Sequence, residues 1–355
     1  MRDDERVFAL AFNKRETCAE RPMFRILTRG RATLLLAAAI VLPSLPSGDP
    51  IPDGLPMLRY RVGSGAIIWR FALSPDGQNI ATTDEMGRLR LRPVGQAKGI
   101  ERYLDVSGQA QAMAFSPDGR FLAVGRVEPD VLLFDLRKNN KQRSLGIPIR
   151  DIRHLRFSPD GQTLAVSSGH APEILLWDIK AGQPRMILRG HSAPVNSMVF
   201  APDGQMLASS TGGRDSDLLV WDLATGRPRH RLIATRVFAL AYSPDGRLLA
   251  TANGREKTVR IWDARTGRPL RPIAGHVLPV RSIAFSPDGR LMATAAGDGT
   301  ASLWCVATGR ELRRLDAGAD MLRHITFSPD GRSLMATGND DDIRLWDLSR
   351  LKITE

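Results

Sequence analysis

The sequence predicts an all-β protein built from seven similar, four-stranded antiparallel units. The tripeptide Pro-Asp-Gly recurs at spacings of 42 or 43 residues, with short apolar runs on both sides of each copy. Proline presets the backbone of a tight turn and glycine supplies its positive φ, so each copy predicts a turn. A constant period is the signature of a repeat architecture. The seven turn aspartates are Asp76, Asp118, Asp160, Asp203, Asp245, Asp288 and Asp330.

The fifth unit shows how each element is predicted. Leu240 and Tyr242 lie four and two residues before the turn proline, and this period-two alternation predicts strand a. The apolar run 248–251 follows the turn and predicts strand b. After a polar turn, residues 259–263 predict strand c, and the stretch after Thr-Gly-Arg-Pro (266–269) predicts strand d. Each unit is therefore expected to be a four-stranded meander.

Two dipeptides carry a family resemblance. Trp-Asp ends strand c in several units, as at 262–263 and 346–347, and Gly-His opens units at 190–191 and 275–276. From about residue 54 to 355 the chain resembles the WD-repeat β-propeller family. The resemblance implies a seven-bladed β-propeller in which His, a strand-b Ser or Thr, a turn Asp and the Trp form a buried hydrogen-bonded tetrad. Carried over residue by residue, the complete tetrads are His191, Ser209, Asp215 and Trp221, and His276, Thr294, Asp298 and Trp304.

The other five units depart from this pattern. None of them opens with the Gly-His pair, and Arg92 and Phe134 stand at the Trp position of units 1 and 2. A tetrad that lacks members leaves buried polar groups unpaired, so these blades are expected to depend more on apolar packing.

Ring closure is predicted from the two ends of the repeat array. The sequence continues only a few residues beyond strand c of unit 7, at 343–347, while residues 54–61 resemble a strand d. An N-terminal strand that completes the last blade closes the ring and removes exposed sheet edges. The expected organisation is an N-terminal leader, 1–48, followed by one propeller, 49–355.

The leader has the order of a secretory signal peptide. Residues 23–31 are basic, 32–42 are apolar apart from one threonine, and 43–48 are small and turn-forming. An apolar run of this length is shorter than the ~20 residues that a membrane-spanning helix needs. Translation from Met23 instead of Met1 would place the segment at the N-terminus and predict an exported, periplasmic or otherwise extracytoplasmic protein. Otherwise the protein is expected in the cytoplasm, with the run as an apolar arm packed on the propeller.

The sequence lacks the common signatures of catalysis. No G-x-S-x-G, H-E-x-x-H or Gly-rich phosphate loop occurs, and the two cysteines, Cys18 and Cys305, suit neither a disulfide framework nor a zinc site. No insertion is long enough for a catalytic domain. The sequence therefore predicts no enzyme activity, metal or cofactor. The histidines are interpreted as structural, although His154 and His324 share one repeat column in nonadjacent units.

The repeat alignment predicts a binding surface at one opening of the ring. In a ring of meanders, the d–a and b–c connections lie at one opening and the a–b and c–d connections at the other. The position six residues before the turn proline lies at the d–a and b–c opening. It holds arginines and aromatics in five of the seven units. Arg and aromatic residues dominate binding hot spots. Because arginine binds carboxylate and phosphate in a bidentate manner, an extended acidic or phosphorylated segment of a protein partner is expected to bind there. The resemblance points to the same rim. With Arg236 added, the predicted Arg/aromatic rim is Trp69, Arg153, Arg236, Phe238, Arg281 and Arg323.

Three alternatives remain open at the level of sequence. The rim aromatics could pack under neighbouring loops while the arginines pair with acids such as Asp151, Glu256 and 340–342. The net charge of +12 and seven arginines on the opposite, a–b and c–d rim favour a polyanion or nucleic-acid partner. An enzyme centred in the channel would need converging acids or histidines. The opposite-rim arginines are Arg120, Arg227, Arg247, Arg268, Arg290, Arg310 and Arg332.

Overall fold

The structure is a computed structural model. It describes residues 57–61, 67–94, 102–212, 217–234, 236–254, 256–340, 342–349 and 351. The leader, 1–48, lies outside the described residues.

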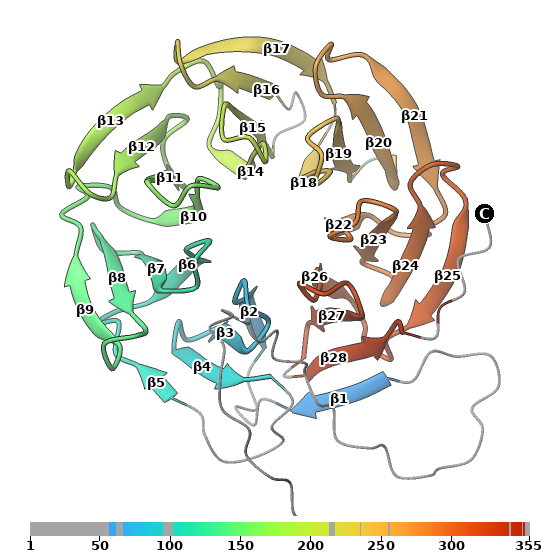
Figure 1. Cartoon of the computed structure of the whole chain (residues 1–355), viewed down its shortest axis with the longest axis horizontal. Helices are drawn as coiled ribbons and strands as arrows, with labels where there is room; N and C mark the ends of the chain where they lie inside the picture. The colour runs from blue at the N-terminus through green and yellow to red at the C-terminus, as the bar shows by residue number, and fades with distance from the viewer. Residues whose placement is uncertain are drawn as a thin grey trace, which may run out of the picture. The chain divides into compact units, whose positions relative to one another are not determined.

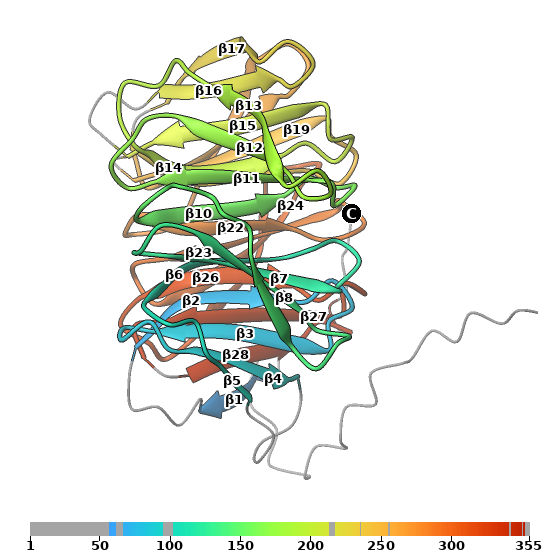
Figure 2. The ribbon, with the colours of Figure 1, turned by 90° about the vertical axis from the view of Figure 1, so that its left-hand side faces the viewer.

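The described strands form seven four-stranded antiparallel sheets arranged as blades around a central channel (Figure 1). This confirms the predicted all-β, seven-bladed fold. Strand a of each blade lies next to the channel and runs along the ring axis (Figure 2). Strands b, c and d follow outward in chain order in blades 1 to 6.

The first three blades are as follows. Blade 1 consists of β2 (Ile68–Leu73), β3 (Asn79–Asp84), β4 (Leu89–Pro93) and β5 (Arg102–Leu104). Blade 2 consists of β6 (Ala110–Phe115), β7 (Phe121–Arg126), β8 (Val131–Asp135) and β9 (Lys141–Ser144). Blade 3 consists of β10 (Ile152–Phe157), β11 (Thr163–Ser168), β12 (Ile174–Asp178) and β13 (Gln183–Leu188).

The remaining blades repeat the same order. Blade 4 consists of β14 (Val195–Phe200), β15 (Met206–Thr211), β16 (Asp217–Asp222) and β17 (Arg227–Ile233). Blade 5 consists of β18 (Val237–Tyr242), β19 (Leu248–Asn253), β20 (Thr258–Asp263) and β21 (Pro269–Ala274). Blade 6 consists of β22 (Val280–Phe285), β23 (Leu291–Ala296), β24 (Thr300–Cys305) and β25 (Glu311–Asp316). Blade 7 consists of β26 (Leu322–Phe327), β27 (Ser333–Gly338), β28 (Asp342–Asp347) and β1 (Met57–Arg61).

The Pro-Asp-Gly turns form as predicted and are reinforced by a preceding serine in six of the seven blades. In blade 6, Ser286 Oγ donates to Asp288 Oδ1 at 2.6 Å and accepts the backbone N–H of Leu291 at 2.9 Å. Gly289 has a φ of 70° and donates its N–H to the Ser286 carbonyl. The side-chain bonds fix the width of the turn and thus the start of strand b.

The core lies between adjacent blades. One buried cluster joins Leu133 and Ile147 of the second repeat to Leu155, Leu164 and Trp177 of blade 3, and similar clusters join the other neighbours. Because each blade buries its apolar faces against the next one, a single blade would lose most of its core in isolation.

The N-terminal strand closes the ring, as expected from the sequence. Strand β1 pairs antiparallel with β28, with Met57 opposite Trp346. Arg59 Nη2 also donates to the carbonyl of Ala317 at 2.9 Å, in the connection that precedes β26. Blade 7 is therefore built from both ends of the propeller sequence.

Candidate functional site

A β-bulge in every strand a positions the predicted rim residues. The pairing of strands a and b shifts by one residue near the start of strand a in all seven blades. A bulge leaves one residue unpaired and re-aims its side chain. The bulged residues are Trp69, Gln111, Arg153, Asn196, Phe238, Arg281 and Arg323, which is the column six residues before the turn proline.

Two pairs of bulged residues from neighbouring blades stack on each other. The guanidinium carbon of Arg281 lies 4.4 Å from the ring centroid of Phe238, and that of Arg323 lies 4.9 Å from the Trp69 ring. The Phe238 ring lies against Gly254, where an added Cβ would overlap the ring. These cation–π contacts hold the two guanidinium planes at the rim.

Arg153 is held differently. Its Nε lies 2.9 Å from Asp151 Oδ1, and the other oxygen of Asp151 lies 3.3 Å from His170 Nε2. The expected pairing of rim arginines with rim acids is thus found for Arg153. Glu256 and Asp340 pair instead with the strand-c residues Arg260 and Arg344.

The structure brings four of the six predicted rim residues to one cavity. Arg153, Phe238, Arg281 and Arg323 line the central channel, whose volume is about 960 Å³. Trp69 contacts this group through Arg323. Arg236 has a φ of 48° and an exposed side chain, and it is outside the set of residues that line the cavity.

Four further ionisable residues line the channel and were not singled out as site residues from the sequence. They are Arg70 of blade 1, His154 and Arg156 of blade 3, and His324 of blade 7. The shared repeat column of His154 and His324 was the available signal, because Arg70 occupies the same column. Arg70 Nε donates to the Gln111 carbonyl at 2.8 Å, and Arg156 Nη1 to the Leu155 carbonyl at 2.9 Å.

Burial and mutual repulsion perturb these groups. Burial first, and then the charges of Arg153, Arg156 and Arg323, lower the pKa of Arg70 to about 10. Burial and the neighbouring arginines lower the pKa of His154 to about 3 and that of His324 to about 4. At neutral pH the two imidazoles are therefore uncharged, while the arginines keep their charge.

The residues of the predicted tetrads form hydrogen-bonded clamps in blades 4 and 6. In blade 6, Thr294 Oγ1 lies 2.7 Å from His276 Nε2 and accepts the Trp304 Nε1–H at 2.8 Å, and His276 Nδ1 lies 3.4 Å from Asp298 Oδ2. These contacts join strands b and c to the connection before strand a.

In blade 4, Ser209 Oγ lies 2.6 Å from His191 Nε2 and 2.7 Å from Trp221 Nε1. Asp215, the carboxylate that the sequence assigned to this clamp, lies outside the described residues. Asp217 accepts a hydrogen bond from Ser192 Oγ at 2.9 Å, and its charge acts on His191.

A comparison with known families agrees with this geometry. The model of the WD40 family, described as "WD domain, G-beta repeat", matches residues 182–222, 226–263, 267–305 and 309–347. The chain is a WD-repeat β-propeller. The four matches end with strand c of blades 4, 5, 6 and 7, and the structure extends the same architecture to the three blades before them.

WD-repeat propellers are commonly protein-interaction scaffolds. On the opposite rim, Arg120 pairs with Asp135 at 2.9 Å, and Arg247 lies 3.8 Å from the turn carboxylate Asp245. Arg227, Arg268 and Arg310 are exposed.

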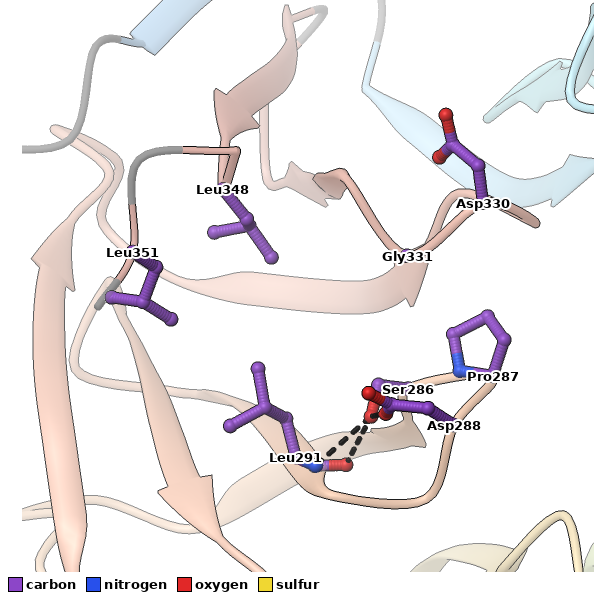
Figure 3. A pocket seen from close by; sticks show the side chains of 8 residues that line it. All are labelled: Ser286, Pro287, Asp288, Leu291, Asp330, Gly331, Leu348 and Leu351. Atoms are coloured by element: carbon purple, nitrogen blue, oxygen red, sulfur yellow. Dashed lines mark hydrogen bonds between the residues drawn. The ribbon is translucent and has the colours of Figure 1, made fainter. Parts of the chain in front are cut away.

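A small pocket of about 200 Å³ also lies on this side of the WD-repeat propeller, between the turns of blades 6 and 7 (Figure 3). Leu291, Leu348 and Leu351 form its apolar wall, and Asp288 and Asp330 lie on its turn side. Ser286 is occupied by the turn hydrogen bonds described above.

No group of three or more His, Cys, Asp or Glu residues among the described residues could hold a metal ion. No helix within the described ranges has the length and apolar character needed to cross a membrane.

Proposed function

We propose that this chain is a noncatalytic scaffold that binds an acidic segment of a protein partner at the Arg/aromatic rim. The observation that carries the proposal is the pair of stacks at the channel opening, Arg281 on Phe238 and Arg323 on Trp69. Stacking fixes a guanidinium plane before the partner arrives, which reduces the entropy lost on binding.

The chemistry of the rim supports an acidic partner. Within the described ranges, neither Arg281 nor Arg323 forms an ion pair with a carboxylate, and Arg323 Nε donates to the neutral side chain of Asn339 at 2.5 Å. Guanidinium groups without a carboxylate partner can form bidentate bonds with an incoming carboxylate or phosphate. The adjacent rings supply the apolar contact typical of a hot spot.

Affinity capture from the native source tests this function. The full chain is compared with Arg281→Gln/Arg323→Gln, and the matched control is Arg227→Gln/Arg268→Gln, which removes the same charge from the opposite rim. All captures are made at near-physiological salt with and without nuclease, and bound material is identified by mass spectrometry. We expect a nuclease-resistant protein partner that is lost from the rim variant and retained by the control.

The outcomes separate the two rims. Captured material that disappears with nuclease, and is lost from the Arg227→Gln/Arg268→Gln variant, would replace this proposal with polyanion binding at the opposite rim. A protein partner that binds both variants equally would place the interaction elsewhere on the ring and contradict the proposal.

We further propose that residues 23–48 direct export and are removed. The proposal rests on the basic, apolar and turn-forming order of this segment. Mass spectrometry of the native protein should find a chain that begins near residue 48. Recovery of peptides from 24–47 would contradict it.

A further inference from the structure

The central channel has an unbalanced charge. Five arginines line it, contributed by strands a of blades 1, 3, 6 and 7, and no Asp or Glu occurs among the described residues that line it. The arginines are Arg70, Arg153, Arg156, Arg281 and Arg323.

Most of this charge has no ionic partner within the described part of the chain. Only Arg153 contacts a carboxylate, that of Asp151. Arg70, Arg156 and Arg323 each donate to a neutral oxygen, of Gln111, Leu155 and Asn339. Neutral oxygens satisfy donors but leave the positive charges in place.

The arginines form two levels along the ring axis. Arg153, Arg281 and Arg323 occupy the bulges at the opening, while Arg156 lies three residues farther along β10. At a rise of about 3.4 Å per residue, its backbone starts roughly 10 Å deeper in the channel than that of Arg153. A ligand that enters from the rim can therefore meet guanidinium groups on several sides and at two depths.

We infer that the channel is a binding site for a small anion that carries several phosphate groups. Guanidinium groups bind phosphate oxygens in a bidentate manner, and a multivalent anion offsets the repulsion between arginines of different blades. The volume of about 960 Å³ suits a small molecule. This site does not depend on the proposed partner, because two of its arginines, Arg70 and Arg156, are not members of the Arg/aromatic rim.

We expect a small ligand because the arginines are enclosed by the ring. Strands a of all seven blades surround the cavity (Figure 1), so its deeper arginines are reached only along the axis. The exposed arginines of the opposite rim lack this enclosure and are more strongly screened by salt. Low-dielectric walls around charges of one sign strengthen their attraction for a counter-ion.

Isothermal titration calorimetry with sodium tripolyphosphate tests the site on the full-length protein at constant ionic strength. The variant Arg156→Gln removes one positive charge from the channel. The Arg156 side chain donates its hydrogen bond to the carbonyl of the preceding residue, Leu155. Arg70→Gln is a second channel variant, and Arg227→Gln is the matched control on the opposite rim. We expect one tripolyphosphate per chain, at least tenfold weaker binding in each channel variant, and unchanged binding in the control.

Thermal unfolding of the same proteins without ligand shows whether the variants are folded. Because Arg156→Gln relieves repulsion, its melting temperature should equal or exceed that of the wild type, while the increase caused by tripolyphosphate should shrink. A lower melting temperature without ligand would overturn the repulsion argument and the proposal with it.

Two further titrations identify the ligand class. Inorganic phosphate should bind at least tenfold more weakly than tripolyphosphate, and a hexaglutamate peptide should not compete with it. Tighter binding of hexaglutamate would make the channel a peptide site. Weak binding at many sites, equal in channel and control variants, would mean a general effect of surface charge. Either result would falsify the proposal.

Discussion

Arg344 in β28 and Asp340 in the turn before it form an ion pair, with Nη2 2.5 Å from Oδ2. The Arg344 side chain is fully buried, and its Nε donates to the carbonyl of Ala317 at 2.6 Å. The pair thus ties strand c to the b–c turn and to the connection before strand a. These are the elements that the His-centred clamp joins in blade 6.

Blade 5 repeats the arrangement at the same repeat position. Arg260 binds Glu256 through Nη2 at 2.7 Å and donates to the Ile233 carbonyl at 3.4 Å. Blades 5 and 7 lack Gly-His, so an arginine and an acid replace the clamp there. The sequence interpretation that such blades depend mainly on apolar packing is incomplete for these two.

The first prediction concerns this pair. Asp340→Ala should lower the free energy of unfolding by about 2–4 kcal/mol, because it leaves the buried Arg344 charge without its carboxylate. Urea unfolding followed by tryptophan fluorescence measures the loss. Asp320→Ala, which removes an exposed carboxylate, is the control and should stay within about 0.5 kcal/mol of the wild type.

The second prediction concerns the clamp of blade 6. Thr294→Val should cost about 2–4 kcal/mol, because the hydroxyl serves both His276 and Trp304. Thr337→Val makes the same change where the buried hydroxyl has no hydrogen-bond partner among the described residues, so it should be neutral or stabilising. Equal losses in the two variants, by chemical denaturation, would show that the clamp contributes little.

The third prediction is a pH dependence. Burial lowers the pKa of His191 to about 4, from an ordinary value of 6.5. Between these values the unfolded chain binds more protons than the folded one, so acid favours unfolding. The free energy of unfolding should therefore fall as the pH drops from about 6.5 towards 4.

The variant His191→Gln isolates this contribution. His154 and His324 titrate in the same direction in both proteins, so their effect cancels in the difference between wild type and variant. The wild type should lose stability more steeply than His191→Gln over this range. Parallel profiles in urea unfolding at several pH values would contradict the assignment.

The fourth prediction tests the support of the rim. Gly254→Ala places a methyl group where the Phe238 ring lies, so the ring must move and its stack with Arg281 should be lost. We expect a cost of about 1–3 kcal/mol and weaker partner binding. In Gly212→Ala the nearest side-chain atom, Cγ of Asn196, is 3.3 Å away, and a smaller effect is expected.

The regular part of the fold could be predicted because the repeat makes it visible. The Pro-Asp-Gly period located every a–b turn, and the Trp-Asp and Gly-His pairs pointed to the clamps. Five of the six rim residues share one alignment column, so the sequence could group them, whereas Arg236 lies outside that column and outside the cavity lining. Each of these signals is local and is repeated along the sequence.

What could not be predicted depends on the geometry of the ring. Arg70 and Arg156 come from blades 1 and 3 and occupy different repeat positions, so alignment alone does not bring them together. The bulges add one residue to each strand a without a fixed sequence signal. The sequence also does not show that the ion pair of Arg344 and Asp340 takes the place of a His clamp. An arginine in strand c is usually solvent-exposed, and the burial of Arg344 is known only from the structure.

The pairing of β1 with β28 also has a consequence for the order of events during synthesis. The bond from Arg59 to Ala317 spans 258 residues, so the first strand of the ring is made long before its neighbours exist. Blades 1 to 6 can form as each one leaves the ribosome, but blade 7 is completed only when β28 has been made. Until then β1 lacks the strand it pairs with, and this is the stage at which a chaperone would have access to it.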